Sequence, residues 1–311
     1  MLLRAPFLIL LVLPLVAQRR SYAASPLAGA NPVADEPQGA LLWREAIAVA
    51  DASVRAGDLG RARGQFLFAV RMAESDTMEE KLRQQAVAFT LTHLGVLDLR
   101  LGRTADARKE LERSLVLLDH VNLPQPMEAE LRVWCLAGIS SCLSRQQNTE
   151  KAEVTARAAV DLAQQEFGPA NEITAVALNQ LGAVYFRARD FRNAATLFTS
   201  ALAVLDRLPE ASLEGRARTL INLCHSLSRL GQFANAQDRC SEAVALVARE
   251  AGEDNSLMAI ALQSTADLLE SNGRHKQSKD FRRRAAIIRA RHQDAVADSL
   301  VDVAALTASR P

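Results

Sequence analysis

Residues 168–201 read GPANEITAVALNQLGAVYFRARDFRNAATLFTSA, and this stretch contains two short amphipathic patterns separated by a polar turn. Apolar or small residues recur at spacings of 3, 1 and 3 in the first half and of 4 and 3 in the second: Leu178, Leu181, Gly182 and Tyr185, then Ala194, Phe198 and Ala201. Both sets of spacings are typical of one face of an α-helix. The stretch therefore predicts a hairpin of two helices, with the small residue Gly182 at their crossing.

Two series of small residues indicate that this hairpin is repeated. The first series has spacings of 45, 45, 42, 42 and 42 residues: Ala50, Gly95, Ser140, Gly182, Cys224 and Ala266. The second has the same spacings: Ala62, Ala107, Ala152, Ala194, Ala236 and Ser278. Because one hairpin cannot bury both of its faces, the two series predict a stack of six hairpins.

The composition favours helices throughout the chain. Hydrophobic residues make up 49% of the 311 residues but aromatic residues only 5%, so the core must be built largely from Ala, Leu and Val. No run alternates with period two for long, as strands would require. Pro and Gly punctuate the pattern between hairpins, and an Asn, Asp or Ser that follows them can cap the next helix.

The pattern resembles tetratricopeptide repeats, and its 42-residue form is similar to the repeats of the kinesin light chain. The matching residues in the fourth and fifth hairpins are Leu178, Asn179, Gln180, Leu181, Gly182, Tyr185, Phe191, Ala194, Phe198 and Ala201, then Leu220, Asn222, Leu223, Leu227, Gly231, Phe233, Ala236 and Ala243. The resemblance covers about residues 41–290 and implies an all-α, right-handed superhelical solenoid of about six hairpins. Asp98 departs from it, because the equivalent position of the fourth hairpin is Tyr185.

The resemblance also implies a binding surface. In this family the first helices of successive repeats line a concave groove, and an Asn one residue before the Leu of the crossing holds the backbone of a bound peptide. Asn222 matches that position, and Gln180 stands there in the preceding repeat. The candidate partner-binding residues are Asn179, Gln180, Phe186, Arg187, Asn222, His225, Arg229 and Arg145.

An arginine recurs five residues after the small residue of each of the first five crossings. We call this series the arginine ladder: Arg55, Arg100, Arg145, Arg187 and Arg229. Two interpretations stay open. The guanidinium groups could bind carboxylates of an extended acidic partner segment, or they could cap the C-terminal carbonyls of the helices that carry them.

The two ends of the chain have a different composition. An apolar run of 13 residues, Ala5–Ala17, follows Arg4 and precedes small residues. We interpret residues 1–23 as a signal peptide, with an uncleaved membrane anchor as the alternative, although the run is short of the roughly 20 residues that span a bilayer. Residues 24–40 are expected to be a flexible leader, and residues 291–311 a capping helix and frayed tail. Cleavage predicts an exported protein, periplasmic or extracellular, without stable membrane insertion.

Neither the net charge nor the sequence motifs indicate nucleic-acid binding or an enzymatic activity. Without residues 1–23 the chain has 34 basic and 36 acidic side chains, a net charge of −2, so nothing points to nucleic acid as a partner. It has no GxSxG, HExxH or GxxxxGK motif. His225 follows Cys224, but neighbours on a helix point about 100° apart, so they do not form a catalytic pair. We predict no enzyme activity, no metal and no cofactor.

The four cysteines fall into two pairs. Cys135 and Cys142 are seven residues apart on one predicted helix, about 10.5 Å along its axis, which is too far for a disulfide between them. Cys224 and Cys240 lie on the two helices of one hairpin, and Cys240 occupies the position of Phe198 in the preceding one. A disulfide that joins these helices is one hypothesis, and two buried free thiols are the alternative.

These observations predict a non-enzymatic protein-interaction scaffold that binds a protein or peptide segment in its groove. The partner would be acidic if the arginine ladder contacts it. The alternative is a regulatory or assembly subunit that docks onto an envelope complex through its convex surface or through the basic run Arg282-Arg283-Arg284.

Overall fold

The computed structural model describes residues 38–291 except 76–77 and 210, and within them it contains twelve α-helices and no strand. The helices form six hairpins, numbered 1 to 6 in chain order. The first helices of the hairpins are α1 (Gln38–Ala56), α3 (Glu80–Arg100), α5 (Met127–Arg145), α7 (Glu172–Arg187), α9 (Leu213–Arg229) and α11 (Ser256–Ser271). The second helices are α2 (Leu59–Ala73), α4 (Thr104–Leu118), α6 (Thr149–Phe167), α8 (Phe191–Leu205), α10 (Phe233–Ala251) and α12 (His275–Arg291). The predicted signal peptide and capping helix lie outside the described residues, and α1 begins within the segment expected to be leader.

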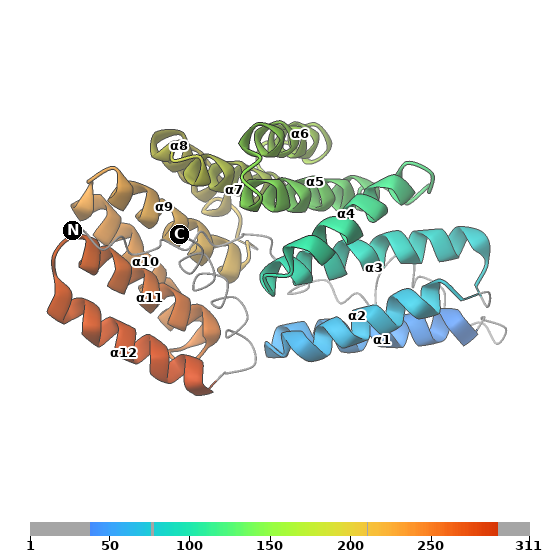
Figure 1. The fold of residues 1–311 in the computed structure, drawn as a ribbon, viewed down its shortest axis with the longest axis horizontal. Helices are drawn as coiled ribbons and strands as arrows, with labels where there is room; N and C mark the ends of the chain where they lie inside the picture. The colour runs from blue at the N-terminus through green and yellow to red at the C-terminus, as the bar shows by residue number, and fades with distance from the viewer. Residues whose placement is uncertain (1–37, 76–77, 210, 292–311) are drawn as a thin grey trace, which may run out of the picture.

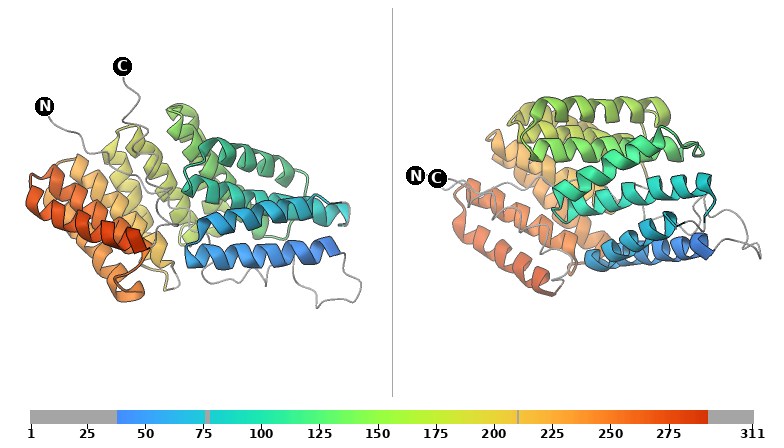
Figure 2. Two further views of the ribbon diagram at one scale, coloured as in Figure 1. Left: turned by 60° about the horizontal axis from the view of Figure 1, so that its bottom comes forward. Right: turned by 45° about the vertical axis from the view of Figure 1, so that its right-hand side comes forward.

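The hairpins stack into a curved solenoid, as Figures 1 and 2 show. Each second helix packs against the first helix of its own hairpin, and α2, α4, α6, α8 and α10 also pack against the first helix of the next one. The first helices also contact one another, which places them on the inner side of the curve. Between α1 and α3 this contact includes a hydrogen bond of 2.8 Å from Trp43 Nε1 to Thr90 Oγ1. The all-α helical repeat predicted from the sequence is thereby confirmed.

The two series of small residues lie at the helix crossings. All ten Ala, Ser and Cys members are 0% exposed. A Cβ atom added at Gly182 would lie 2.8 Å from Phe198 Cε1, and one added at Gly95 would lie 2.6 Å from Leu111 Cγ. Each glycine therefore faces a large side chain of the second helix, and the small residue is required by the volume of its partner.

Most turns and helix caps lie where the sequence has Gly or Pro between helices and Asn, Asp or Ser before the next helix. The first residue or two after each first helix includes one with positive φ: Gly57, Gly102, Gln147, Arg189, Gly231 and Gly273. Asn171, Ser212 and Asn255 cap α7, α9 and α11 by accepting a hydrogen bond from a backbone N–H of the first turn, at 2.9, 3.1 and 2.8 Å. The predicted caps at these three separators are confirmed.

Gly182→Val is expected to lower the free energy of unfolding by about 1–3 kcal/mol, because its side chain would overpack the crossing with Phe198. Gly64→Ala in α2 is the matched control. No atom lies within 4 Å of a Cβ added at Gly64, so this change should raise stability by about 0.5–1 kcal/mol through the better helix propensity of Ala. Urea denaturation of both variants measures the difference, and a neutral Gly182→Val would show that the crossing is not tightly packed.

Candidate functional site

Six buried polar side chains lie along the inner helices of hairpins 3 to 5, and we call them the polar row: Ser140 and Ser141 on α5, Asn179 and Gln180 on α7, and Asn222 and Ser228 on α9. Two hydrogen bonds connect the helices across this row. Gln180 Nε2 donates to Ser140 Oγ at 3.4 Å, and Asn222 Nδ2 donates to Asn179 Oδ1 at 3.3 Å. The structure therefore buries three of the candidate residues, and it pairs Asn179 with Asn222 and Gln180 with Ser140 in two separate hydrogen bonds between neighbouring inner helices.

Several atoms of the polar row have no hydrogen-bond partner within the described part of the chain. They are Ser141 Oγ, Asn179 Nδ2, Gln180 Oε1 and Ser228 Oγ. An unsatisfied buried donor or acceptor costs about 1–3 kcal/mol, so four of them on three successive inner helices form an unusual group. Both donors and acceptors occur among them, which suits the alternating N–H and C=O groups of a polypeptide backbone.

Phe186 and His225 lie close to this row in the sequence, and both are buried. Phe186 is buried and packs edge to face on Phe191, with ring centroids 5.1 Å apart. His225 follows Asn222 by three residues, so both lie on one side of α9. Burial lowers the pKa of His225 to about 4, so the imidazole is neutral at pH 7.

The arginine ladder stands in the last turns of α1, α3, α5, α7 and α9, as its spacing predicts. Arg145 Nη2 donates to the carbonyl of Leu99 in the last turn of α3, at 3.4 Å. The guanidinium of Arg229 lies 4.7 Å from the centroid of the Phe191 ring. These contacts give Arg145 and Arg229 a structural role, and Arg145 binds a C-terminal carbonyl of the inner helix of the preceding hairpin. Arg187 is half-buried at the equivalent place on α7.

Arg100 of the ladder makes an ion pair with a residue of hairpin 5. Its Nη2 lies 3.5 Å from Oε1 of Glu214, at the start of α9. The same oxygen accepts a hydrogen bond of 2.8 Å from Arg218 Nε. Arg218 is buried, with 9% of its surface exposed. A carboxylate of hairpin 5 is thus held between arginines of hairpins 2 and 5.

The cysteines of hairpin 5 form a disulfide. Cys224 and Cys240 are bonded, with their Cα atoms 5.5 Å apart, and the bond joins α9 to α10 at the crossing. The disulfide hypothesis is confirmed in this structure, and Cys224 has no thiol for a pair with His225. Cys135 and Cys142 are free and buried, as their spacing predicts.

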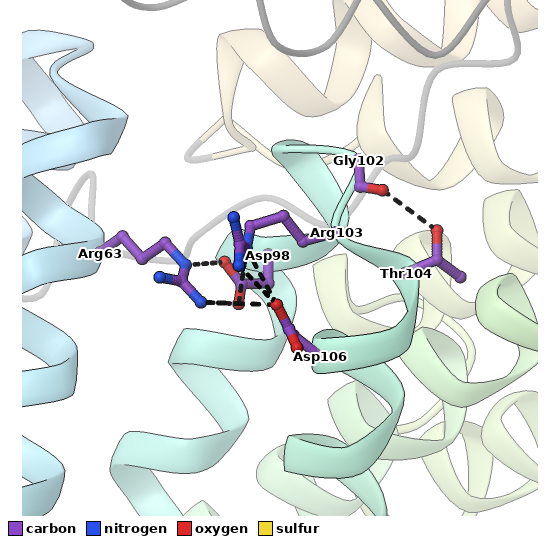
Figure 3. Close-up of polar contacts among 6 residues, drawn as sticks. All are labelled: Arg63, Asp98, Gly102, Arg103, Thr104 and Asp106. Atoms are coloured by element: carbon purple, nitrogen blue, oxygen red, sulfur yellow. Dashed lines mark hydrogen bonds and ion pairs between the residues drawn. The ribbon is translucent and has the colours of Figure 1, made fainter. Parts of the chain in front are cut away.

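A second polar cluster joins hairpins 1 and 2, and Figure 3 shows its contacts. Asp98 Oδ1 accepts a hydrogen bond of 2.6 Å from Arg63 Nε, and its Oδ2 accepts one of 3.0 Å from Arg63 Nη2. The Asp98 side chain is 0% exposed. Arg103 and Asp106 surround this pair, with Arg103 Nη2 2.7 Å from Asp106 Oδ2. Asp98, which departs from the family pattern, therefore pairs with Arg63 on the neighbouring hairpin.

Two residues of the basic run at 282–284, Arg282 and Arg284, form ion pairs within their own end of the solenoid. Arg282 lies 3.5 Å from Asp267 Oδ1 and 3.4 Å from Glu270 Oε2, both on α11. Arg284 lies 3.9 Å from Glu253. These ion pairs give the run a structural role in hairpin 6.

The sequence reasoning did not single out Glu214, Arg218, Ser141 or Ser228. The first two could have been found, because Glu214, Arg218 and Asn222 are spaced by four residues and so share one face of α9. The two serines carry no comparable signal.

The described residues contain no group of three or more His, Cys, Asp or Glu side chains placed to hold a metal ion. None of the helices in these ranges has the length and apolar character of a membrane span.

Stacked helical hairpins with an inner row of first helices define the class of protein as an α-solenoid. Residues 132–207 and 215–289 match the family model described as "Tetratricopeptide repeat". These segments cover hairpins 3 to 6 except for a few residues at their ends and are therefore tetratricopeptide repeats, which confirms the resemblance drawn from the sequence for this part of the chain. A comparison with curated proteins gives no match.

Solved structures share this fold at low sequence identity. The Rap protein complexed with Competence and Sporulation Factor is 14% identical, with a TM-score of 0.62 over 83% of this chain and 77% of that one. The Rap conjugation gene regulator of the plasmid pLS20, in complex with the Phr* peptide, is 12% identical, with a TM-score of 0.53 over 88% and 83%. The putative kinesin light chain TPR-like repeats from Podosopora anserina are 14% identical, with a TM-score of 0.52 over 70% and 99%.

Proposed function

We propose that this chain is a protein-interaction scaffold whose inner surface binds an extended segment of a partner protein along α5, α7 and α9. The main support is that several buried polar atoms of the polar row have no hydrogen-bond partner among the described residues. Asn179 Nδ2 can donate to a backbone carbonyl and Gln180 Oε1 can accept from a backbone N–H, so these two amides together suit a bound main chain. Such contacts hold a segment without depending on its side chains.

The burial of the polar row sets a condition on this binding. Asn179 and Gln180 are 1% and 2% exposed. A segment therefore reaches their amide groups only when neighbouring elements move apart. Inner helices of stacked hairpins are suited to such motion, because each hairpin packs mainly on its neighbours and small rotations add along the stack.

Two comparisons support a peptide or protein as the ligand. One similar structure is in complex with the Phr* peptide, and another is complexed with Competence and Sporulation Factor. Docking through the convex surface or the basic run is the rival proposal, and the ion pairs of Arg282 and Arg284 do not favour it. Export of the chain also stays a proposal, which the disulfide supports because such bonds persist in oxidising compartments.

A display library of random peptides, selected on the chain from residue 24 onward, tests the proposal. The double variant Gln180→Ala, Asn222→Ala should bind the selected peptides about tenfold to a hundredfold more weakly, because it removes the Gln180 acceptor and the Asn222 amide that orients Asn179. The control is Gln237→Ala, Asn235→Ala on the exposed side of α10. Equal affinity of the peptides for the double variant and the unchanged protein, measured by fluorescence anisotropy, would place binding elsewhere.

A further inference from the structure

The Arg100–Glu214 ion pair spans two hairpins that are not neighbours. Hairpins 3 and 4 separate its two residues along the solenoid, and the atoms are nevertheless 3.5 Å apart. In Figure 1 the end of α3 points toward α9 across the inner side of the curve. The pair therefore depends on how strongly the stack is curved, unlike a contact within one hairpin.

Glu214 is held in place by its own helix. It stands in the first turn of α9, where a negative charge is favoured by the helix dipole, and Ser212 caps that helix. Arg218, four residues later, donates to it at 2.8 Å. Arg100 adds a longer contact of 3.5 Å from another hairpin. The contact between Arg100 and Glu214 is therefore the weaker of the two, and another anion can take the place of Glu214 beside Arg100 at a small cost in free energy.

The arrangement has an excess of positive charge. Burial raises the pKa of Glu214, but Arg100 and Arg218 outweigh this effect and lower it, so the group is a carboxylate at neutral pH. Two guanidinium groups around one carboxylate have a net charge of +1. Each guanidinium has five N–H donors, and only one of Arg218 and one of Arg100 face Glu214 in the contacts above.

The position of Arg218 connects this charge to the polar row. Arg218 precedes Asn222 by four residues, so both lie on the same face of α9. A segment whose backbone bonds to Asn179, the partner of Asn222, passes close to Arg218, and one residue of an extended chain spans about 3.3 Å. A side chain of that segment is therefore within reach of the two arginines.

We propose that Arg100 and Arg218 form a carboxylate site of the inner surface, and that an acidic side chain of the bound segment replaces Glu214 there. This inference rests on the proposed function and specifies the chemistry of its partner. The replacement releases hairpin 2 from hairpin 5, so recognition of an acidic residue also opens the surface that contains the polar row. Glu214 acts as an internal competitor that neutral segments do not displace.

Fluorescent deca-glutamate and deca-glutamine peptides test this site on the chain from residue 24 onward at low ionic strength. Glu214→Gln removes the competitor and should bind deca-glutamate about tenfold more tightly, the effect of one strong charge-assisted contact. Glu242→Gln is the matched control, because it removes one negative charge from the other helix of the same hairpin, where Glu242 pairs with Arg239. Its affinity for deca-glutamate should not change. Arg218→Gln should weaken binding.

The gain in affinity of Glu214→Gln for deca-glutamate tests the carboxylate site even if Arg218→Gln fails to fold. Equal affinity of Glu214→Gln and Glu242→Gln for deca-glutamate, or equal binding of deca-glutamine, overturns the carboxylate site. The proposed function is judged separately with the peptides selected by display. If those peptides need Gln180 and Asn222 but Glu214→Gln leaves every affinity unchanged, the groove function stands and the acidic specificity is wrong.

Discussion

Replacing Arg63 with methionine is expected to lower the free energy of unfolding by about 3–5 kcal/mol, because it leaves a buried carboxylate without its main partner. Asp98 accepts two hydrogen bonds from Arg63, and its side chain is 0% exposed. Arg103 Nε remains 3.8 Å from Asp98 Oδ2, but its side chain is 49% exposed, so it compensates only in part.

The reverse replacement should cost less. In Asp98→Leu the unpaired group is Arg63, whose side chain is 22% exposed and can turn toward water. We expect a loss of about 1–3 kcal/mol for that variant. The double variant Arg63→Met, Asp98→Leu removes both charges and should recover most of the loss, as replacing buried ion pairs by apolar residues often does.

The loss in Arg63→Met should depend on pH in a defined direction. Burial raises the pKa of Asp98, while the hydrogen bond and charge of Arg63 lower it. Without Arg63 the folded-state pKa rises further above the unfolded value. The cost of the ionised carboxylate is then largest above that pKa and is relieved as the pH falls through it. Urea denaturation at pH 8 and pH 5 should show the larger loss at pH 8. An equal loss at both values would mean that Asp98 is not the group left unpaired.

The fold was predictable because its signal is local and repeated. The spacing of small residues such as Gly182 and Ala194 reports which residues meet at a helix crossing, and each crossing involves residues of one hairpin. The capping residues Asn171, Ser212 and Asn255 act within one turn of their helices. Local constraints of this kind can be read from one sequence.

The candidate site was less predictable because it depends on distances between hairpins. The sequence pointed to Asn222 and Gln180, which the structure places in one polar row, but the pairing of Asn222 with Asn179 required the tilt between α7 and α9. The Arg100–Glu214 pair depends on the curvature accumulated over several hairpins, for which no short spacing exists. Asp98 was visible as a departure from the pattern, yet its partner Arg63 could be identified only once hairpins 1 and 2 were packed.

Loss of the disulfide in hairpin 5 is expected to have the second large effect. The bond closes a loop with a sequence separation of 16 residues. Loops of this length correspond to about 3 kcal/mol of stabilisation in the chain-entropy view. Because hairpins pack mainly on their neighbours, the loss should be concentrated in hairpins 5 and 6. In Cys224→Ala, Cys240→Ala, hydrogen exchange should accelerate in α9 and α10 and remain nearly unchanged in α1.

The preceding hairpin supplies the matched rescue for this variant. Cys224 and Cys240 correspond to Gly182 and Phe198, 42 residues earlier in each case. The variant Cys224→Gly, Cys240→Phe should therefore fill the crossing by packing and restore part of the protection that the alanine pair loses. If the two variants are equally destabilised, covalent linkage rather than crossing volume fixes α9. If the rescue succeeds and also restores binding of selected peptides through Asn222, then the disulfide stabilises the inner surface by holding the same helix geometry that glycine and phenylalanine hold in hairpin 4.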